Sequence, residues 1–546
     1  MLPPVMFPAT AAADAETVCA WLASVAPGAS LTSDSRSVKP GDVFLAYAHV
    51  LATSPATGAR TDGRSFIDDA IERGARAVLF DNGAFAWNDQ LSVPHLGIAG
   101  LRQIAGVLAN RHYGKPDQNM FTVAVTGTNG KTSCTQWLGS ALSRSGTPTV
   151  VIGTFGVGLF EAGKTPAFDT TGYTTPDAVQ LQHALAAARA KGAGMLAIEA
   201  SSIGLHQQRM DGLHVDVALF TNLTRDHLDY HGDMAAYESA KTSLFDWPGL
   251  RHAVINLDDP MGPRLIARLH ERAPTVQVTT YSLNAPSIAA SDKPSGVSHA
   301  ALCLFASELR ISHAGTQFQL RVASPATANA PQPMVQIKTR LVGDFNVSNV
   351  LGVLGVLLAR GLALTEAVAA VEALQPVAGR MQQLGAPDQP LVVIDYAHTP
   401  DALEKTLTSL RLLAQGRHGA LWCVFGCGGD RDPGKRGQMG AVAQAADHVI
   451  VTSDNPRNEV PAAIIADIVA GAGSSVAQGR PAPQVIEDRA TAILWALRHA
   501  AKADVVLLAG KGHENYQEIK GRKLHFLDAD HAALALAARA TMKGAG

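Results

Sequence analysis

Short apolar runs alternate with amphipathic stretches along most of the chain. Between residues 121 and 258 the runs read "FTVAVT", "TVVIGT", "MLAIEA", "VDVALFTNL" and "HAVINLD", and after residue 343 they read "PLVVIDYA", "ALWCVFG", "HVIVTS" and "ADVVLLAG". Apolar runs of this length predict buried strands, and strands that alternate with helices predict parallel sheets with helices on both faces. The pattern therefore predicts an α/β fold built around two parallel sheets.

The pattern changes twice along the chain, and the changes divide it into three predicted domains. Residues 1–99 are rich in turns, as in "LTSDSRSVKPGDVFLAYA", and residues 50–60 are interpreted as a loop insertion. Residues 100–340 contain the first series of runs and a looser β-like passage that ends in the Pro/Ala-rich "PATANAPQPM". Residues 341–546 contain the second series.

The composition is that of an ordinary globular protein, with 47% hydrophobic and 17% charged residues. A net charge of -2 provides no electrostatic basis for binding nucleic acid. No apolar run approaches the roughly 20 residues of a membrane span, and the first residues do not resemble a signal peptide. Five widely spaced cysteines favour reduced thiols. We therefore expect a cytoplasmic protein without a membrane span, and we expect a monomer.

Polar and glycine residues directly follow the predicted strands. Gly127, Glu199 and Asn222 do so in the first series, and His398, Gly426, Asp454 and Gly510 do so in the second. Ligands of open parallel sheets bind beyond the carboxyl ends of the strands. The positions therefore predict an active site in a cleft between two domains.

The stretch "AVTGTNGKTS" resembles a phosphate-binding loop that joins a strand to a helix. Val125 stands where the usual spacing has glycine. The loop offers backbone amides, a helix N-terminus, a lysine charge and a hydroxyl for Mg²⁺. The alternative is a glycine turn that happens to precede a helix, and the preceding strand argues against it. The predicted nucleotide-binding residues of the loop are Gly127, Thr128, Asn129, Gly130, Lys131, Thr132 and Ser133.

Three further features have both a functional and an ordinary interpretation. Glu199 is either a second Mg²⁺ contact or a solvated residue at a strand end. The segment "FTNLTRDHLDYHG", which contains His227, offers oxygen and imidazole ligands for metal and phosphate, or is an exposed polar loop. Lys241, judged by composition and spacing alone, is a helix-surface lysine.

The order of several motifs resembles the Mur ligase family of peptidoglycan synthesis. The motifs are "TGTNGKT", "EASSIGL", "FTNLTRDHLDYHG", "GDFNVSNVLG", "GRMQ", "IDYAHTPDAL", "FGCGGDRDPGKRGQMG", "SDNPRNEVP" and "GKGHENYQ", and the resemblance extends from about Ser33 to near the C-terminus. Members of this family have the shortened phosphate loop, so Val125 is expected there. The likeness is greatest to the branch that adds the third residue of the stem peptide.

The resemblance implies a cytoplasmic ligase of three domains that uses ATP and Mg²⁺ in cell-wall synthesis. Residues 1–99 would bind the UDP part of the substrate, residues 100–340 would form a P-loop ATPase-like domain, and residues 341–546 would form a Rossmann-like domain for the incoming amino acid. The γ-carboxylate of UDP-N-acetylmuramoyl-L-alanyl-D-glutamate would become an acyl phosphate. The amine of meso-diaminopimelate would then attack it to form an amide.

The resemblance also assigns roles to individual residues. Lys131, Glu199, His227 and Lys241 would be catalytic, and Thr132, Glu199, His227 and Lys241, the last as a carbamate, would hold Mg²⁺. Beyond the loop, Asn349, Arg380 and Asp395 would bind ATP. Ser33, Ser35, Thr174, Thr175, Ser201, Gln207 and Arg209 would hold the UDP-linked substrate. Tyr173 stands where asparagine or histidine is commoner in the family, so one of these contacts is expected to differ.

The set predicted for the incoming amino acid is Arg431, Asp454, Asn455, Pro456, Arg457, Gly510 and Glu514. Diaminopimelate differs from lysine chiefly by an extra carboxylate, which an arginine fork grips bidentately. Arg457 follows Pro456, which restrains the loop. The motif "DNPR" marks the diaminopimelate-adding enzymes of the family. A surface salt bridge is the alternative for Arg457.

Three other functions are alternatives to this one. The same ligase could use L-lysine, or the chain could be a folylpolyglutamate-type ligase, which shares the loop and the carbamylated lysine. The motifs "DNPR" and "SDSR" argue against the latter. A nucleotide switch or scaffold that makes no bond is opposed by the joint presence of Lys241, His227 and "GKGHE".

Overall fold

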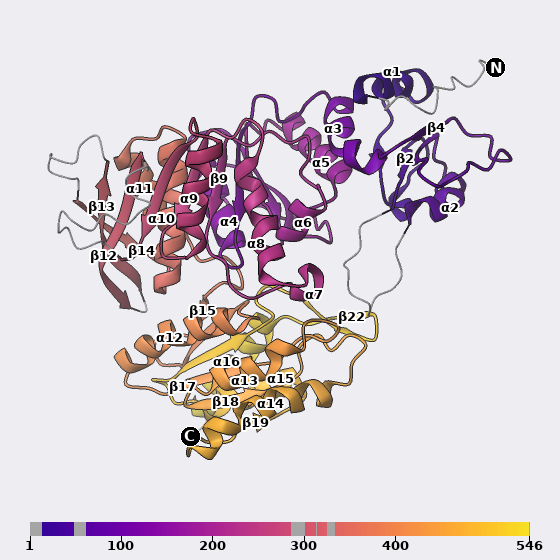
Figure 1. Ribbon diagram of the computed structural model, residues 1–546. Helices are drawn as coiled ribbons and strands as arrows, with labels where there is room; N and C mark the ends of the chain where they lie inside the picture. The colour runs from indigo at the N-terminus through magenta and orange to yellow at the C-terminus, as the bar shows by residue number, and fades with distance from the viewer. Residues whose placement is uncertain (1–13, 49–61, 285–300, 313, 325–333, 545–546) are drawn as a thin grey trace.

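The computed structural model describes residues 14–48, 62–284, 301–312, 314–324 and 334–544 (Figure 1). The predicted insertion at 50–60 and nearly all of the Pro/Ala-rich passage lie outside these ranges. Within them, no helix combines the length and the apolar character needed to cross a membrane. All five cysteines are free, and four of them are buried.

The N-terminal part is a small parallel sheet with helices on both faces. Its strands, in sheet order, are β1 (Leu31–Thr32), β2 (Val43–Ala46), β3 (Ala77–Asp81) and β4 (His95–Ile98). Alternate residues of each strand point to opposite faces. One face packs against α1 (Ala15–Val25) and α3 (Leu101–His112), and the other packs against α2 (Ile67–Glu72).

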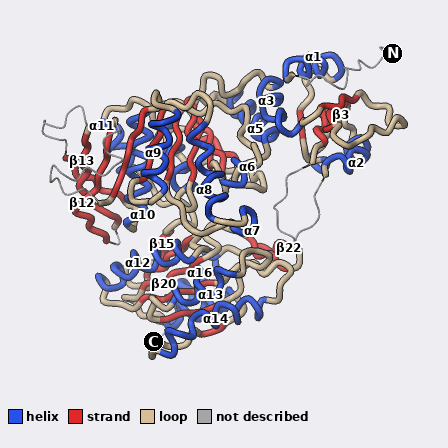
Figure 2. Tube along the Cα trace, in the orientation of Figure 1, coloured by secondary structure: helices blue, strands red, loops and turns tan. Residues whose placement is uncertain are grey.

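A ten-stranded sheet forms the middle of the molecule (Figure 2). In sheet order its strands are β14 (Met334–Thr339), β13 (Gly315–Ala323), β12 (Leu302–Ser312), β11 (Gln277–Ser282), β10 (His252–Asn256), β9 (Val217–Phe220), β5 (Phe121–Thr126), β8 (Met195–Glu199), β6 (Thr149–Gly153) and β7 (Gly156–Phe160). The pairs from β6 to β12 are parallel, and β7, β13 and β14 are antiparallel additions at the two edges.

Helices cover both faces of this sheet. One face carries α4 (Lys131–Ser143), α10 (Asp344–Ala359) and α11 (Leu364–Glu372), and the other carries α5 (Ala178–Ala190), η4 (Ser243–Asp246) and α9 (Met261–Arg272). Three short helices, α6 (Ser202–His206), α7 (Leu228–His231) and α8 (Met234–Thr242), follow strands β8 and β9. The carboxyl ends of the central strands therefore lead into connecting segments that can carry ligand-binding side chains.

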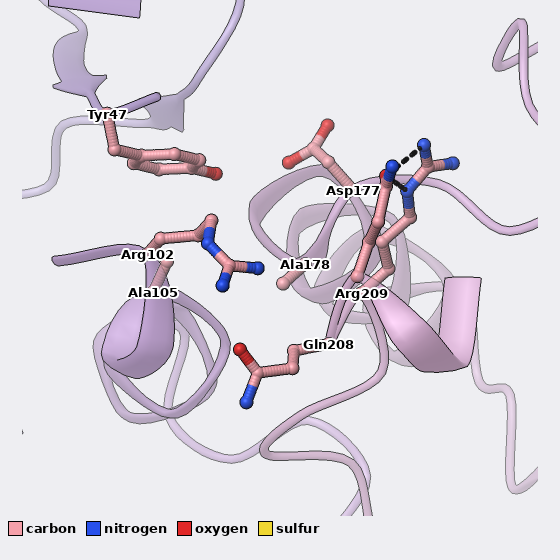
Figure 3. A pocket seen from close by; sticks show the side chains of 8 residues that line it. Tyr47, Arg102, Ala105, Asp177, Ala178, Gln208 and Arg209 are labelled. Atoms are coloured by element: carbon pink, nitrogen blue, oxygen red, sulfur yellow. Dashed lines mark hydrogen bonds between the residues drawn. The ribbon is translucent and has the colours of Figure 1, made fainter. Parts of the chain in front are cut away.

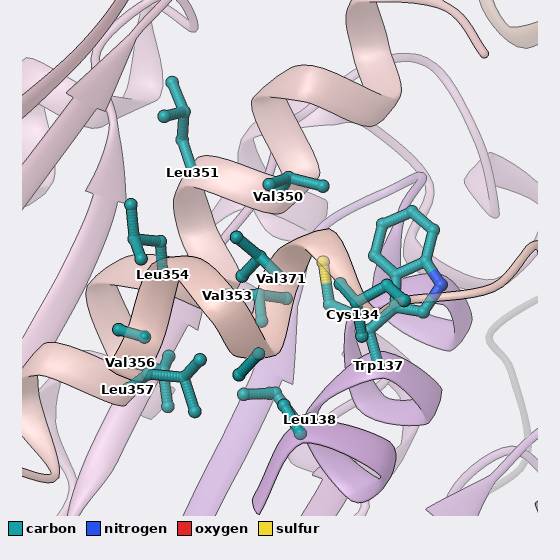
Figure 4. Packing of buried hydrophobic residues seen from close by; sticks show 14 of the residues in the cluster. Cys134, Trp137, Leu138, Val350, Leu351, Val353, Leu354, Val356, Leu357 and Val371 are labelled. Atoms are coloured by element: carbon teal, nitrogen blue, oxygen red, sulfur yellow. The ribbon is translucent and has the colours of Figure 1, made fainter. Parts of the chain in front are cut away.

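The packing of α10 bears on the division into domains. This helix is apolar around most of its circumference, and Val350 and Val353 lie on the side that faces Cys134 and Leu138 of α4, whereas Leu354 lies on the other side (Figure 4). A helix of that composition has to be buried on several sides. The predicted boundary at residue 341 places α10 and α11 in the third domain, whereas their packing joins them to the middle sheet. We therefore propose that the middle domain extends to about Val377.

The third part is a six-stranded sheet in the order β15 (Gln382–Leu384), β16 (Leu391–Asp395), β20 (Val505–Ala509), β17 (Leu421–Phe425), β18 (His448–Val451) and β19 (Gln484–Val485). All its pairs are parallel except β15 with β16. One face carries α12 (Pro400–Gly416), α13 (Gly434–Ala443) and α14 (Pro461–Ala477), and the other carries α15 (Arg489–His499) and α16 (Asp528–Gly544). A hairpin, β21 (Tyr516–Ile519) and β22 (Arg522–His525), follows β20. The predicted α/β class is confirmed.

Candidate active site

The phosphate loop joins β5 to α4, so its amides lie at a helix N-terminus. Gly127 and Gly130 have φ angles of +150° and +88°. A side chain at Gly127 would collide with the hydroxyl of Thr221, and one at Gly130 would collide with the amide of Asn349. Both positions therefore require glycine, and the loop keeps an open backbone surface suited to phosphate.

Two lysines donate to the same carbonyl oxygen of the loop. Nζ of Lys131 lies 2.8 Å from Gly127 O and 2.9 Å from Thr128 O, and Nζ of Lys241, in α8, lies 2.8 Å from Gly127 O. Burial lowers the pKa of Lys131. Burial and the charge of Lys131 hold the pKa of Lys241, which is 1% exposed, well below its ordinary value. The structure thus places Lys241 inside the site, where its neutral amine is favoured.

Glu199 ends β8 and presents its carboxylate to the first turn of α4. Its Oε2 accepts hydrogen bonds from the hydroxyls of Thr132 and Thr154, each at 3.1 Å, and Oε1 accepts from the Thr154 amide at 2.9 Å. The side chain is buried. The predicted metal-binding pair of Thr132 and Glu199 therefore lies together beside the loop.

Asp226 links the segment after β9 with the third domain. Its Oδ2 lies 3.5 Å from Nε2 of His227 and 3.9 Å from Nε2 of His398. Burial alone would raise the pKa of Asp226, but the charges of His227, His398 and Lys435 hold the pKa below its ordinary value. Burial lowers the pKa of His227, and it lowers the pKa of His398 to about 4. His227 thus lies beside the phosphate-loop lysines, on the side of the site that faces the third domain.

The middle-domain residues predicted to hold the UDP-linked substrate form one hydrogen-bonded group next to Glu199. Thr175 Oγ1 donates to the Glu199 carbonyl at 2.7 Å and lies 2.8 Å from Ser201 Oγ. Arg209 donates to the Thr175 carbonyl at 2.8 Å and twice to Gln207 Oε1, at 2.9 and 2.6 Å. Thr174 joins the group through its hydroxyl, which lies 3.3 Å from the Thr154 hydroxyl.

A pocket of about 30 Å³ continues from this group toward the N-terminal domain (Figure 3). It is lined by Tyr47, Arg102, Ala105, Asp177, Ala178, Gln207, Gln208 and Arg209. Burial raises the pKa of Tyr47, and a hydrogen bond with Ser33 opposes the rise. Ser33 therefore lies beside the pocket, and Ser35 is buried at the start of the short helix η1 (Ser35–Ser37). Their contact with a uridine group stays a prediction.

The three nucleotide residues predicted beyond the loop have different settings. Asn349 is buried in α10 against Gly130. Arg380 donates to the Thr132 hydroxyl at 3.3 Å and lies over the Tyr396 ring, 4.2 Å from its centroid. Asp395 accepts from the amides of Met381 and Ala397 at 2.8 and 2.9 Å, and burial raises its pKa. Arg380 is thus already directed at the predicted phosphate and metal position.

The predicted amino-acid residues Asp454, Asn455 and Glu514 gather around a lysine that was not predicted. Nζ of Lys511 lies 3.2 Å from Asn455 Oδ1, 3.2 Å from Glu514 Oε2 and 3.7 Å from Asp454 Oδ1. Gly510 adjoins the carboxylate of Asp454. Lys511 lies within the quoted motif "GKGHE", and its position directly after a strand was the available signal.

Arg457 is held in place by the third domain itself. Its Nη1 donates to the Gly429 carbonyl at 2.7 Å, and its Nε lies 3.3 Å from Glu518 Oε2. Pro456 precedes Arg457, and the φ angle of Arg457 is +50°. The side chain of Arg457 is 19% exposed, and Arg431 is exposed on the loop after β17. Arg457 therefore forms an ion pair, as the alternative interpretation predicted. The ion pair and the hydrogen bond together fix the orientation of its guanidinium group.

Several polar contacts cross between the middle and third domains. Besides the contacts of Arg380 with Thr132 and of His398 with Asp226, Asn129 Nδ2 donates to Asp401 Oδ2 at 3.3 Å, and Arg225 Nη2 lies 3.4 Å from Asp432 Oδ2. In each of these, one partner belongs to the phosphate loop, the first turn of α4 or the segment after β9. The carboxyl ends of the two sheets thus meet around the loop.

The residues present fit a magnesium ion that is shared with phosphate. Within the described residues, no three His, Cys, Asp or Glu side chains converge on one point. Mg²⁺ is typically bound by one or two carboxylates together with substrate phosphates, and not by an all-protein cage. The hydroxyl of Thr132 and the carboxylate of Glu199 supply hard oxygen donors of that kind beside the phosphate loop.

Comparison with known proteins identifies the family. The Mur ligase middle domain matches residues 125–357, and the Mur ligase glutamate ligase domain matches residues 379–512. The UDP-N-acetylmuramoyl-L-alanyl-D-glutamate–2,6-diaminopimelate ligase of Janthinobacterium sp. (strain Marseille) is 61% identical over 525 residues, which covers 96% of this chain and 97% of that protein. The ligase of the same name from Ralstonia nicotianae is 49% identical over 526 residues and covers 95% of each chain.

A solved structure of a ligase of this name agrees with these matches. It has a TM-score of 0.61 and 34% sequence identity, and it covers 94% of this chain and 95% of its own. The similarity therefore includes the N-terminal sheet as well as the two larger sheets. From the domain matches, the near full-length relatives and the phosphate loop facing Arg380, we conclude that this chain belongs to the Mur ligase family.

Proposed function

We propose that this chain is an ATP-dependent ligase of peptidoglycan synthesis that joins meso-2,6-diaminopimelate to UDP-N-acetylmuramoyl-L-alanyl-D-glutamate. The relatives at 61% and 49% identity are ligases named for these two substrates. The observation that carries the proposal is the contact between Arg380 and Thr132, because it sets the phosphate loop against the domain with the predicted amino-acid residues. We place the reaction in the cytoplasm, where ATP is available.

The phosphate half of the site has to overcome repulsion between a triphosphate and a carboxylate. Lys131 would exchange the two loop carbonyls that it now contacts for phosphate oxygens. Mg²⁺, when bound, supplies further positive charge, and Thr132, Glu199, His227 and a carbamate on Lys241 would hold it. Arg380 would stabilise charge on the transferred phosphoryl group from the opposite side.

The proposed reaction has two chemical steps. The γ-carboxylate of the UDP-linked dipeptide attacks the γ-phosphorus of ATP, which forms an acyl phosphate and releases ADP. The neutral amine of diaminopimelate then attacks the acyl carbon, and the tetrahedral intermediate loses inorganic phosphate to give the amide. The enclosed group of Thr175, Ser201 and Arg209 would position the dipeptide, and Asn349 and Asp395 would bind the nucleoside part of ATP.

The third domain would select the amino acid. The carboxylates of Asp454 and Glu514 suit an ammonium group, and Arg457 and Arg431 suit carboxylates. Asn455, Gly510 and the restraint from Pro456 would shape the pocket between them. Because lysine lacks the additional carboxylate, a site that commits arginines to that group favours diaminopimelate.

A phosphate-release assay tests the proposal. The enzyme, ATP, Mg²⁺ and the UDP-linked dipeptide are incubated with a panel that contains meso-diaminopimelate, L-lysine and L-glutamate. We expect release that requires both the dipeptide and diaminopimelate, and we expect Lys131→Ala to abolish it. Lys191→Ala, at the exposed end of α5, is the matched control. A preference for lysine, or release without the dipeptide, would refute the assignment.

A further inference from the structure

Lys511 is fully buried at the centre of the predicted amino-acid site. It follows Gly510 directly after β20, and its side chain has no exposed area. The ammonium contacts oxygens of Asn455, Glu514 and Asp454, each within 3.7 Å. A buried ammonium without such partners would be strongly unfavourable. The two carboxylates therefore stabilise the buried ammonium of Lys511. In return, the ammonium compensates the negative charge of the two carboxylates.

The lysine fixes the orientation of the Asn455 amide. Lysine offers donors and no acceptor, so only the oxygen of the amide can face it. Asn455 Oδ1 accepts from Lys511 Nζ at 3.2 Å and from the Glu518 amide at 2.9 Å, which turns Nδ2 toward Glu514 Oε2 at 2.7 Å. The two hydrogen bonds from Asn455 and Lys511 both use Oε2 of Glu514. Within the described part of the chain, Oε1 has no hydrogen-bond partner, so it is available to a ligand.

The lysine also sets the charge of this region. Burial, and next the charge of Asp454, raise the pKa of Glu514, whereas Lys511 and the Asn455 amide oppose the rise. The other ionisable groups that face Glu514 are Tyr396, Tyr516 and Arg489. Without the ammonium, two neighbouring carboxylates would share one buried site, and one of them would take up a proton.

We propose that Lys511 is a positioning residue for the incoming amino acid: its ammonium lies between the carboxylates of Asp454 and Glu514, compensates their negative charge and directs the free oxygen of Glu514 toward the ammonium group of that substrate. Lys511 does not itself touch the amino acid. This role rests on the ligase activity proposed above. It adds Lys511 to the site as the residue that balances the charge of Asp454 and Glu514, the carboxylates proposed to bind the ammonium group of the substrate.

The test compares Lys511→Met and Lys511→Gln with the control Lys523→Met. Lys523, in β22, lies over the same Tyr516 ring as Lys511, at 4.3 Å against 5.7 Å from its centroid, but it contacts neither carboxylate. We expect both Lys511 variants to raise KM for diaminopimelate by about tenfold or more, with KM for ATP and for the UDP-linked dipeptide changed by less than about threefold. The control should match the wild type.

The pH profile separates this role from a merely structural one. In Lys511→Met, kcat/KM for diaminopimelate should fall as the pH decreases from about 8 to about 6, because Glu514 becomes protonated, and the wild type should change less. Adding Glu514→Gln to Lys511→Met should remove the additional pH dependence. Lys511→Gln can still hydrogen-bond to its neighbours, so it tests the charge with little loss of structure.

Each other result has a defined meaning. An unchanged KM for the amino acid, or equal increases for all three substrates, would overturn the role of Lys511. Failure of both variants to fold would assign Lys511 to stability alone and would also overturn it. If the wild type ligates a different amino acid, the proposed substrate is wrong, and the same KM comparison is made with that amino acid.

Discussion

Arg489 and Asp528 form an ion pair in which neither side chain is exposed, with Nη2 2.7 Å from Oδ2 and Nε 2.8 Å from Oδ1. Arg489 also donates to the carbonyl of Ala509 at 2.9 Å. Burial would lower the pKa of Arg489, but the charge of Asp528 raises it above its ordinary value. The pair thus connects α15 and α16 to the end of β20, immediately before Gly510.

Arg489→Met should strongly destabilise the third domain. The substitution leaves the carboxylate of Asp528 buried without its partner, a change that costs about 3–5 kcal/mol. Denaturant unfolding, followed by hydrogen exchange of the β20 amides, measures the loss. Arg498→Met, at an exposed position of the same helix, is the control and should change stability by less than about 0.5 kcal/mol. Similar losses for the two variants would show that the pair does not stabilise the fold.

Lys241→Ala should be almost inactive, with a loss of about a hundredfold or more in kcat. The neutral amine favoured by burial is the form that reacts with carbon dioxide, and the carbamate supplies an anion beside the phosphate loop. Millimolar formate or acetate should restore part of the activity by replacing that anion, whereas Lys131→Ala should not respond. Full activity with an amine shown by mass measurement to be unmodified would contradict the carbamate.

Arg457→Ala should lower kcat/KM for diaminopimelate by about ten- to a hundredfold, because a charge-assisted contact of about 1.5–3 kcal/mol is lost. The use of lysine should fall much less. Glu518→Gln is the informative companion, since it removes the ion-pair partner of Arg457 and keeps the guanidinium. We expect that variant to retain selectivity. Equal losses for both amino acids in Arg457→Ala would mean that the arginine only maintains the loop.

Acid should destabilise the protein partly through His513. Burial, followed by the charges of Arg380 and Lys511, lowers its pKa to about 3, from an ordinary value of 6.5. The folded state therefore disfavours the protonated ring, and this contribution is complete above about pH 6.5 and is lost as the pH falls toward 3. The ring packs at a tilt of 56° against Phe155, with 4.3 Å between the ring centroids, and Nδ1 has no hydrogen-bond partner among the described residues.

His513→Phe keeps the ring and removes the titration. Between pH 7.5 and pH 5, the thermal midpoint of this variant should decrease less than that of the wild type. His525→Phe, at an exposed position of β22, is the control and should follow the wild type. An identical decrease in all three proteins would exclude His513 as a source of the acid sensitivity.

The sequence reveals strands best where they are apolar throughout. The run at Phe121–Thr126 is β5 residue for residue, because a central parallel strand is buried on both faces. In contrast, β7 (Gly156–Phe160) and β11 (Gln277–Ser282) were not predicted, since glycine and threonine dilute their apolar character. The helix α10 was assigned to the third domain because the strand pattern resumes after it, and only packing shows which sheet it covers.

The site residues show a similar limit. The phosphate loop has a local pattern, so Gly127, Lys131 and Thr132 could be found from the sequence. Lys241 and Lys511 are single lysines, and nothing nearby in the sequence shows that both are buried. Their burial comes from residues far away in the chain, such as Gly127 for Lys241 and Asn455 for Lys511. Only the resemblance indicated the first, and the signal for the second was limited to its position directly after a strand.

The backbone passes from the middle sheet to the third sheet once, between the end of α11 at Glu372 and the start of β15 at Gln382. Each side of that passage has a large apolar core, and the two are joined at Val342, Ile311 and Phe345, which pack against the core of the third sheet. The enzyme is therefore divisible: chains 1–377 and 378–546, produced separately, should each fold and then reassemble into an active pair, held by the polar contacts around the phosphate loop, by the apolar contact at Val342 and by bound substrates. Phosphate release that appears only when the halves are mixed would demonstrate this complementation, and insoluble halves would rule it out.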